Sequence, residues 1–258
     1  MQKRHTDREM YFEEQSRTAS QYYWPYLQQY GIIKPRKVLE IGCGEGGNLL
    51  PFAQAGCEVY GMDLCRQRIR QAEQFFRKRG LRPHLWVGDA VTYNWGEERF
   101  DLILLHDVIE HVADKKGLLR KMHDLLAPGG VAFVGFPAWQ MPFGGHQQIA
   151  RSRLSLCPWI HLLPASVYQK LLYKAGETDE TVRELLAIRD TRCTIEHFQH
   201  VVQESGFRVQ QRTLFLINPH YQIKFGLHPV ALPSLIARLP WLRNFCCSGT
   251  FYLLKSAR

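Results

Sequence analysis

The sequence VLEIGCGEGG, residues 38–47, decides how this chain folds. An apolar run ends at Ile41, and four glycines follow within residues 42–47. Glycine is needed where a turn visits positive φ or where a ligand must approach bare backbone. The apolar segment 48–53 comes next, so the pattern predicts a strand, a glycine-rich turn and a helix whose first N–H groups are unpaired. We therefore expect this turn to receive a nucleotide-like ligand.

Two kinds of ligand fit the glycine pattern. Gly42, Gly44 and Gly47 satisfy the dinucleotide fingerprint, and Asp63 lies about 20 residues further on, as that fingerprint requires. Glu40, however, places a carboxylate two residues before the first glycine. A carboxylate there repels a pyrophosphate but attracts a cation, and S-adenosylmethionine carries a sulfonium and an ammonium. The acidic form of the motif therefore favours S-adenosylmethionine.

Two further predicted strands end in acids that suit such a ligand. The segment 57–64 reaches Asp63, whose carboxylate is placed to accept hydrogen bonds from both ribose hydroxyls. The segment 85–90 reaches Asp89, which can accept a hydrogen bond from an adenine amine. The motifs thus follow one another in the order that an adenosine site requires.

Strands and helices continue to alternate along the chain. Further strands are expected at 100–105, 131–136, 207–217 and 245–255, and helices at 65–79, 114–126, 165–174 and 194–206. Short connections between alternating strands and helices produce a parallel, doubly wound sheet. The predicted fold class is therefore α/β.

Over residues 37–137 the chain resembles a class I S-adenosylmethionine-dependent methyltransferase, and residues 194–258 follow the same family in outline. It is similar to the small-molecule group that includes the ubiquinone-biosynthesis O-methyltransferases. The resemblance implies a Rossmann-like, seven-stranded sheet with helices on both faces and a last strand that runs antiparallel. The residues that it assigns to the cofactor are Glu40, Gly42, Cys43, Gly44, Gly46, Asp63, Leu64, Asp89, Ala90 and His106.

We expect a single methyltransferase domain over residues 1–258. Residues 1–36 are rich in aromatic side chains and form a helical cap, which in similar methyltransferases folds over the cofactor. Insertions at 138–192 and 218–243 follow strands five and six, at the rim of the sheet where ligands bind in such folds. The sequence predicts that they form a substrate lid.

Methyl transfer from a sulfonium is an in-line displacement in which positioning of the reactants matters most. A general base helps when the acceptor is a hydroxyl or an ammonium. His106, at the end of the fourth strand, is the candidate base or cofactor contact, against a purely structural histidine. His146 is the second catalytic candidate. Residues 136–139 lack the Asn/Asp-Pro-Pro-Tyr/Phe sequence of many nucleic-acid amino-methyltransferases, which disfavours base methylation.

A metal site is the less favoured hypothesis for the turn after strand four. Asp107, Glu110 and His111 lie close together there, and His146 lies on the next rim segment. This spacing resembles the Glu-x-x-Glu-His sequence with a downstream His in small-RNA 3′-end methyltransferases, where a divalent ion holds the terminal hydroxyls. Asp107 replaces the first Glu, which shortens its reach. Alternatively, Glu110 and His111 cap and pack the following helix.

The net charge of +9 is unevenly distributed. Residues 205–258 contain seven basic residues and no acidic one. Such a segment indicates an anionic partner (phosphate, nucleic acid or a lipid surface), unless its charge serves solubility alone. Within it, the apolar segment 232–242 contains Arg238, has Trp241 near its end and is followed by Arg243. Such a segment suits either peripheral membrane contact or a lid.

Several absences bear on location. The start of the chain lacks the apolar region of a secretory signal, and no run of 18 uncharged apolar residues occurs. The seven cysteines include no C-x-x-C pair, which favours reduced thiols. These features predict a cytoplasmic protein, with peripheral membrane association as the alternative.

The sequence therefore predicts an S-adenosylmethionine-dependent methyltransferase that acts on oxygen or nitrogen of a small-molecule or lipid-linked acceptor. One alternative is a metal-assisted RNA methyltransferase, although nucleic acid is the less favoured partner. The other is a non-catalytic cofactor-binding protein. The acceptor and the oligomeric state stay open.

Overall fold

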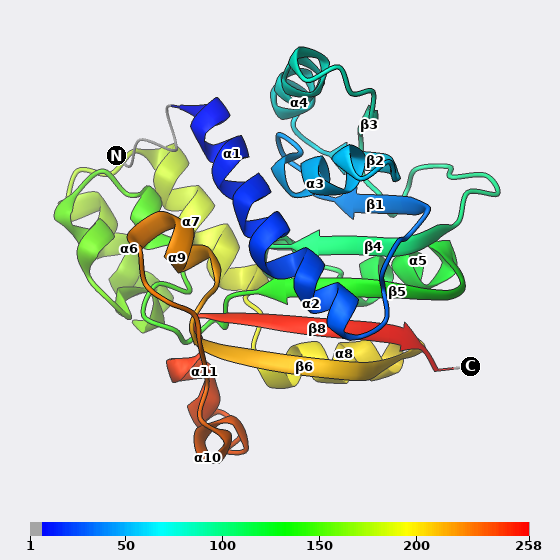
Figure 1. Cartoon of the computed structure of the whole chain (residues 1–258). Helices are drawn as coiled ribbons and strands as arrows, with labels where there is room; N and C mark the ends of the chain where they lie inside the picture. Colours follow the sequence, from blue (N-terminus) through cyan, green and yellow to red (C-terminus); the bar gives the residue numbers. More distant parts are fainter. Residues whose placement is uncertain (1–6, 258) are drawn as a thin grey trace.

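Within residues 7–257, which the computed structural model describes, eight strands form one sheet in the order β3-β2-β1-β4-β5-β8-β6-β7 (Figure 1). The strands are β1 (Lys37–Ile41), β2 (Glu58–Asp63), β3 (His84–Val87), β4 (Phe100–His106), β5 (Leu126–Phe136), β6 (Phe207–Ile217), β7 (Val230–Ala231) and β8 (Gly249–Ser256). Strands β1 to β5 pair in parallel, whereas β8 runs antiparallel between β5 and β6. The predicted mixed α/β sheet with an antiparallel last strand is confirmed.

The predicted number of strands, seven, is one too low for the described chain. The additional strand, β7, pairs antiparallel with the outer edge of β6 and lies inside the segment 218–243 that the sequence assigned to an insertion. A strand of two residues is too short to show the alternation on which sequence-based assignment depends. It extends the sheet at the edge farthest from β1.

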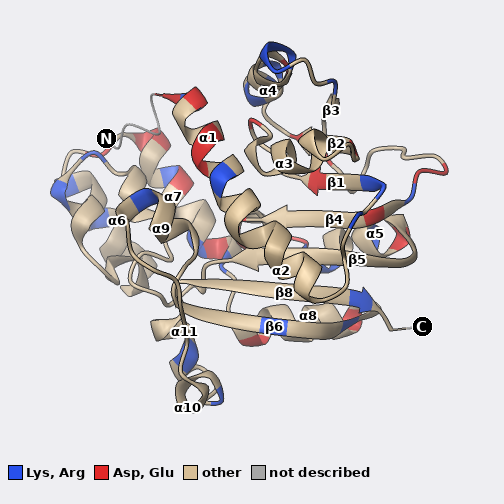
Figure 2. Ribbon diagram, viewed as in Figure 1, with Lys and Arg blue, Asp and Glu red and all other residues tan. Residues whose placement is uncertain are grey.

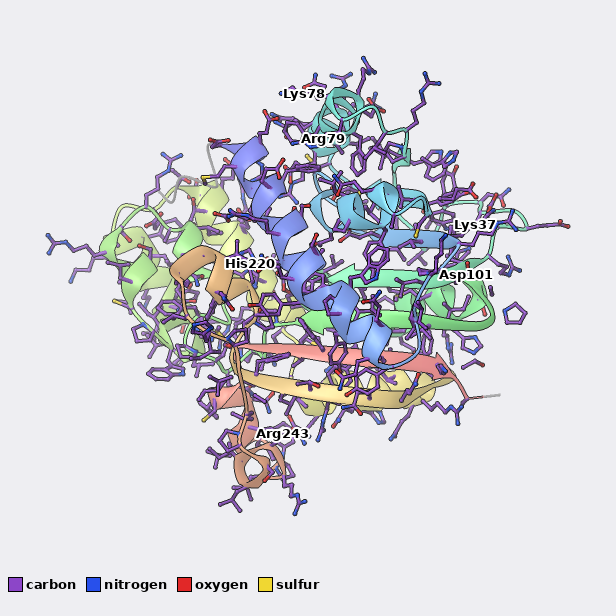
Figure 3. All side chains as sticks on the ribbon, in the orientation of Figure 1. Lys37, Lys78, Arg79, Asp101, His220 and Arg243 are labelled. Carbon is purple, nitrogen blue, oxygen red and sulfur yellow. The ribbon has the colours of Figure 1, made fainter. Side chains whose placement is uncertain are left out.

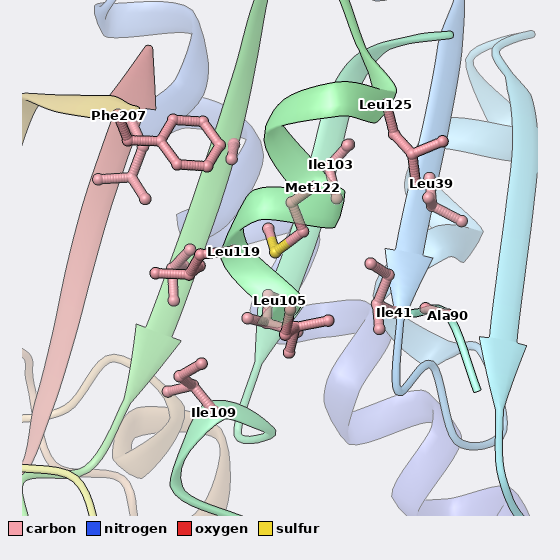
Figure 4. Packing of buried hydrophobic residues seen from close by; sticks show 14 of the residues in the cluster. Leu39, Ile41, Ala90, Ile103, Leu105, Ile109, Leu119, Met122, Leu125 and Phe207 are labelled. Atoms are coloured by element: carbon pink, nitrogen blue, oxygen red, sulfur yellow. The ribbon is translucent and has the colours of Figure 1, made fainter. Parts of the chain in front are cut away.

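Helices cover both faces of the sheet. One face carries α1 (Arg8–Thr18), the π-helical turn η2 (Ala19–Tyr23), α2 (Trp24–Gln29), α3 (Leu50–Gln54) and α4 (Arg66–Lys78); the other carries α5 (Lys115–Leu125) and α8 (Ile195–Glu204). Alternate residues of β4 pack in the cores on the two faces of the sheet, because successive side chains of a strand point to opposite sides. Ile103 and Leu105 pack under α5 (Figure 4), whereas Leu102 and Leu104 pack under the N-terminal helices.

The segment 138–192 builds a small helical unit beside the sheet. It contains short 3-10 turns at Gln147–Ile149, Arg153–Leu156 and Ile160–Leu162, followed by α6 (Ala165–Lys174) and α7 (Asp179–Thr191). The two helices share a core that includes Tyr168, Leu172 and Val182. Helix α6 has the predicted bounds, but α7 was not predicted. Its Thr178 N-cap and acidic first turn are the signals that identify it.

The segment that follows β6 departs from the sheet and returns to it. It contains α9 (His220–Phe225), β7, α10 (Ser234–Ala237) and α11 (Leu242–Cys246). Figure 1 shows α10 projecting beyond the edge of the sheet, whereas α9 lies against α1. None of the helices within residues 7–257 combines the length and apolar character that crossing a bilayer requires.

Candidate functional site

The site lies where the sheet reverses its strand order. Strands β1 and β4 are neighbours, and the connections that leave their carboxyl ends go to opposite faces of the sheet, which opens a crevice beyond these strand ends. At their first residues the two connections are still in contact. Gly42 has φ +71°, and a Cβ atom there would lie 2.4 Å from Cγ2 of Val108. Glycine is therefore required both for the turn and for the close approach of the β4 connection.

The N-terminal helix closes the glycine loop from outside. A Cβ atom at Gly47 would lie 2.5 Å from the carbonyl oxygen of Phe12, so α1 packs directly on loop backbone. Arg8 donates hydrogen bonds to the buried carboxylate of Glu45, with a distance of 2.7 Å from Nε. Lys78, the last residue of α4, pairs with Glu9 of α1, and Arg79, which follows it, pairs with Glu13 (Figure 3). The helical cap is thus fastened to the loop at several points.

A cavity of about 400 Å³ lies at the carboxyl ends of β1, β2, β3 and β4. Its lining comprises Ile41, Gly42, Met62, Asp63, Leu64, Cys65, Arg68, Gly88, Asp89, Ala90, Val91, Asp107, Val108, His111, Val112 and Leu118. Five of the residues assigned to the cofactor from sequence are in this set: Gly42, Asp63, Leu64, Asp89 and Ala90. The structure therefore brings the ends of three predicted strands to one chamber large enough for a small ligand.

Asp63 connects the glycine loop to the cavity. One of its oxygens accepts a hydrogen bond from the backbone N–H of Gly44 at 2.9 Å, and the other accepts from Cys65 at 2.8 Å. Each carboxylate oxygen has a second lone pair available. Asp63 can therefore hold the loop and accept hydrogen bonds from a ligand in the cavity at the same time.

Glu40 lies beneath the glycine loop and is not part of the cavity lining. Its Oε1 accepts a hydrogen bond from Asn48 at 2.7 Å, whereas Oε2 has no hydrogen-bond partner among the described residues. Burial raises the pKa of Glu40 to about 8; the Asn48 hydrogen bond opposes this rise and the charge of Asp63 adds to it. Direct contact between Glu40 and a cofactor stays a prediction.

Three other residues assigned to the cofactor shape the loop but are not part of the cavity lining. Cys43 is buried, and its thiol packs towards β2, where a Cβ on Gly61 would lie 2.9 Å from the sulfur. Gly44 and Gly46 both have positive φ. Their contacts with a cofactor remain predictions.

His106 is packed behind the crevice. Its Nε2 lies 2.8 Å from the hydroxyl of Tyr23, and its Nδ1 lies 3.4 Å from Oδ2 of Asp107. Tyr23 is buried in η2, and burial holds the pKa of its hydroxyl well above the ordinary value, so the hydroxyl stays protonated. His106 lines neither the cavity described above nor the chamber beside it. Its predicted role as base or cofactor contact is therefore not supported by direct access.

Asp107 reaches the crevice from the end of β4. Its backbone has φ +54°, a left-handed conformation that Asp tolerates better than most residues, and its N–H is bonded to the carbonyl of Gly135. Partial removal from water raises the pKa of Asp107, but the imidazoles of His106, His146 and His220 outweigh this effect and bring the pKa below its ordinary value. Asp107 is therefore an anion at neutral pH.

A smaller chamber of about 130 Å³ adjoins the cavity through Asp107, which lines both. Its lining comprises Asp107, Pro137, Met141, Phe143, His146, Gln148, Asn218, His220, Tyr221, Lys224 and Ser248. These residues come from the ends of β4, β5 and β6, from both predicted insertions and from the start of β8. His220 (Figure 3) is held by the Thr18 hydroxyl, 2.9 Å from its Nδ1, which ties α9 to α1. Sequence reasoning missed His220 and Asn218.

Glu110, His111 and His146 lie close together between the larger cavity, which His111 lines, and the smaller chamber, which His146 lines. Oε1 of Glu110 lies 3.9 Å from Nε2 of His111 and 3.8 Å from Nε2 of His146, and three potential ligand atoms lie within 4.8 Å of one another. Neither carboxylate oxygen of Glu110 has a hydrogen-bond partner among the described residues. Burial, reinforced by the charge of Asp107, holds the pKa of Glu110 well above its ordinary value. Asp107, the fourth metal candidate, is not part of this cluster.

A family model described as a methyltransferase domain matches residues 12–211. The chain belongs to this methyltransferase family. The matched range runs from within α1 to the first part of β6, so it contains the larger cavity and the Glu110 cluster.

Two curated methyltransferases match the central part of the domain. Norajmaline N-methyltransferase from Rauvolfia serpentina is 36% identical over 99 residues, and a ubiquinone biosynthesis O-methyltransferase from Ruegeria pomeroyi is 38% identical over 95 residues. Each match covers 37% of this chain, with 34% and 38% of the respective relatives. The chain thus matches little more than a third of the length of these relatives.

Solved structures extend the likeness to nearly the whole chain. An S-adenosylmethionine-dependent methyltransferase from Clostridium acetobutylicum aligns with a TM-score of 0.58 at 12% identity, covering 96% of this chain and 92% of its own. The magnesium protoporphyrin IX methyltransferase of Synechocystis, solved with S-adenosylhomocysteine, aligns with a TM-score of 0.55 at 15% identity, covering 93% and 83%. The fold is therefore that of S-adenosylmethionine-dependent methyltransferases.

Proposed function

We propose that this methyltransferase transfers the methyl group of S-adenosylmethionine to an oxygen or nitrogen of a small-molecule acceptor. The observation that carries the proposal is the position of Asp107, which lines both the larger cavity and the adjoining chamber. A cofactor in the first and an acceptor in the second would meet beside this carboxylate. Holding two reactants in line supplies about 7–11 kcal/mol of the barrier to such a displacement.

The cofactor assignment follows the chemistry of the cavity. Asp63 would accept hydrogen bonds from the ribose, and Asp89 with Ala90 would border the adenine beside the exposed side chain of Leu64. The methionyl end would lie over the glycine loop, above Glu40. A nearby cation favours the ionised carboxylate, so Glu40 would supply a negative charge beneath the loop when the cofactor is bound.

Asp107, rather than His106, is the group that we assign to the acceptor. Its carboxylate would accept a hydrogen bond from the acceptor O–H or N–H, which orients a lone pair towards the methyl carbon. His106 and Tyr23 act behind it as positioning residues, because both imidazole nitrogens are engaged. His146 also faces the chamber, so its predicted catalytic role stays part of this proposal.

The predicted lid is also part of the proposal. Residues of 138–192 and of 218–243 both line the chamber, so an acceptor would be enclosed by the two segments. Excluding water from the reacting atoms strengthens the electrostatic effect of Asp107 and prevents hydrolysis.

The decisive experiment uses S-adenosylmethionine labelled in its methyl group with cell extract separated into lipid, metabolite, RNA and protein fractions. The expected result is label in the metabolite or lipid fraction, abolished by Asp107→Asn while S-adenosylhomocysteine binding persists. Label confined to RNA would favour the RNA methyltransferase. Calorimetric binding of S-adenosylhomocysteine with no label in any fraction would favour a cofactor-binding protein without activity.

A metal-assisted reaction is the second candidate, and the Glu110, His111 and His146 cluster favours it. One carboxylate and two imidazoles are donors that suit Zn²⁺, Mn²⁺ or Fe²⁺. The two distances from Glu110, 3.9 and 3.8 Å, exceed the ~3.4 Å edge of a tetrahedron with bonds of ~2.1 Å, so the three side chains would have to move closer together around an ion. A bound divalent ion would supply Lewis-acid polarisation of an acceptor oxygen. Metal dependence would therefore strengthen the case for a hydroxyl acceptor, including the terminal hydroxyls of RNA.

Peripheral membrane contact is a further part of the proposal, and it concerns the α10–α11 tip, residues 234–245. Five of its large apolar side chains are exposed: Leu235, Leu239, Trp241, Leu242 and Phe245. The tip contains arginine but no acidic residue, as Figure 2 shows, which suits an anionic lipid surface. One expectation needs correction: Arg243 is buried in an ion pair with Glu196, so only Arg238 can face lipid.

A further inference from the structure

A third cavity, of about 450 Å³, lies between the segment 138–192 and α9. Its lining comprises Phe143, Gln148, Ala150, Arg151, Ser155, Leu156, Tyr221, Lys224, Phe225 and Leu227. We refer to it as the α9 groove. Its rim leaves Leu156, Phe225 and Leu227 exposed, and apolar side chains that are exposed together around a groove are typical of a ligand-binding or partner-binding surface.

The α9 groove continues into the acceptor chamber. Phe143, Gln148, Tyr221 and Lys224 line both spaces, and the chamber in turn shares Asp107 with the cofactor cavity. The three spaces therefore form one series from the surface to the cofactor cavity. A molecule that extends from the groove through the chamber would place its inner end beside Asp107.

The lining of the groove combines apolar surface with positive charge. Phe143, Phe225 and Leu227 provide flat or aliphatic walls, whereas Lys224 and Arg151 provide two cations. No carboxylate belongs to the lining given by the described residues. Glu177 lies behind the wall, where it accepts hydrogen bonds from the backbone N–H groups of Arg151 and Ser152 and partly offsets the charge of Arg151. Nζ of Lys224 lies 4.6 Å from the centroid of the Phe225 ring, so this cation stands beside one apolar wall of the groove.

The charges of Asp107 and Lys224 determine which end of an acceptor would face the cofactor cavity. Asp107, an anion, borders the inner end of the series, whereas Lys224 stands where the chamber opens into the groove. An anionic group is repelled at the inner end and attracted at the outer part. The neutral end of the acceptor must therefore face Asp107, and its acidic group must face Lys224.

We propose that the acceptor is an apolar organic anion, in which an aromatic or acyl body carries a carboxylate or phosphate. The acidic group pairs with Lys224, assisted by Arg151, and the body packs against Phe143 and Phe225. A hydroxyl or amine at the far end reaches Asp107 for methylation. This inference rests on the proposed methyl transfer and defines the class of its acceptor.

The test uses three naphthalene probes that differ in charge: 2-naphthoate, 2-naphthyl phosphate and 2-naphthamide. Calorimetry should show at least tenfold tighter binding of one or both anions than of the neutral amide. Whichever anion binds more tightly identifies carboxylate or phosphate as the preferred group. Equal affinity for all three probes, or no binding of either anion, overturns the proposal.

Variants identify the binding site. Lys224→Met keeps the apolar stem and removes the charge, so it should abolish the preference for anions. Lys170→Met, on the exposed surface of α6, is the matched control and should leave the preference unchanged. A preference that survives in Lys224→Met overturns the proposal.

Binding of S-adenosylhomocysteine, measured on the same proteins, separates this inference from the proposed function. Its absence from the wild-type protein contradicts the proposed methyl transfer. Its presence without an anion preference contradicts only the assignment of the acceptor class.

Discussion

The hydroxyl of Tyr23 lies 2.8 Å from Nε2 of His106, which joins the N-terminal cap to the end of β4. The opposite nitrogen of the imidazole faces Asp107. If the hydroxyl donates to Nε2, the ring proton resides on Nδ1 and points at the carboxylate. The cap therefore affects the surroundings of Asp107 through the tautomer of the half-buried His106.

Tyr23→Phe tests this arrangement. Loss of the hydrogen bond frees His106 to rotate or change tautomer, so turnover should fall about tenfold, which corresponds to ~1.4 kcal/mol, while the affinity for S-adenosylhomocysteine stays within twofold. Nitrogen NMR shifts of the histidine report the tautomer directly. Tyr26→Phe is the control, because it removes a similar hydrogen bond, to Thr213 at 3.0 Å, from the same segment. Equal losses of turnover in the two variants would contradict the positioning role.

Asp63→Ala should abolish cofactor binding. The substitution removes the carboxylate from the cavity and leaves the N–H groups of Gly44 and Cys65 without their acceptor. Asp101→Ala is a matched control, since Asp101 also accepts two backbone hydrogen bonds, from Arg36 and Lys37. It lies at the amino ends of β1 and β4, away from the cavity (Figure 3).

Both variants should lose roughly 1–3 kcal/mol of stability, measured by urea unfolding, because each leaves backbone donors unsatisfied. Only Asp63→Ala should lose binding of S-adenosylhomocysteine in calorimetry. Retained binding in Asp63→Ala, or lost binding in Asp101→Ala, would show that the cavity is not the cofactor site.

The sequence was sufficient for those parts of the site that depend on local backbone. The strand-to-loop transition at Gly42 and the strand ending at Asp63 are encoded by neighbouring residues, and both line the cavity. The contacts of Tyr23 and His220 depend instead on how α1 and α9 dock, across 83 and 202 residues of chain respectively. No local pattern reports such contacts.

A contact with a residue distant in sequence also explains why Arg243 was wrongly expected to be exposed. Charge and hydropathy in the segment 232–242 suggested an exposed basic side chain, but Glu196 of α8 accepts hydrogen bonds from Arg243 and Asn244. A buried partner from a distant helix decides the environment of the arginine.

Glu40 should make the stability of the ligand-free protein depend on pH. Its pKa is about 8 in the folded state, compared with an ordinary value of 4.5, so the folded state binds the proton more tightly than the unfolded state does. The resulting stabilisation is fully present below pH 4.5 and is lost as pH rises through about 8. Between pH 5.5 and 8.5 the Tm of the wild-type protein should therefore fall by several degrees more than that of Glu40→Gln. Parallel curves for the two proteins would show that Glu40 does not titrate in this way.

The α10–α11 tip should bind anionic lipid. Sedimentation with vesicles of phosphatidylglycerol should retain the wild-type protein, whereas phosphatidylcholine vesicles should retain much less. Leu235→Ser combined with Trp241→Ser should release it, because the two side chains are 75% and 62% exposed and supply the apolar contact. Ile33→Ser, which alters a residue 67% exposed elsewhere, is the control. Concentration-dependent dimerisation without vesicle binding would identify the tip as a contact between copies instead.

The Glu110 cluster should bind one divalent ion. After treatment with chelator, titration with Zn²⁺ or Mn²⁺ should show a single site that is lost in Glu110→Gln and in His146→Asn. Because burial and the charge of Asp107 raise the pKa of Glu110, protons compete with the ion for this carboxylate, and affinity should therefore rise with pH. His200→Asn is the matched control, since His200 and Glu204 also form a histidine–carboxylate pair, at 3.6 Å on an exposed surface. Unchanged binding in Glu110→Gln would place the ion elsewhere, and no binding to the wild-type protein would show that the cluster is not a metal site.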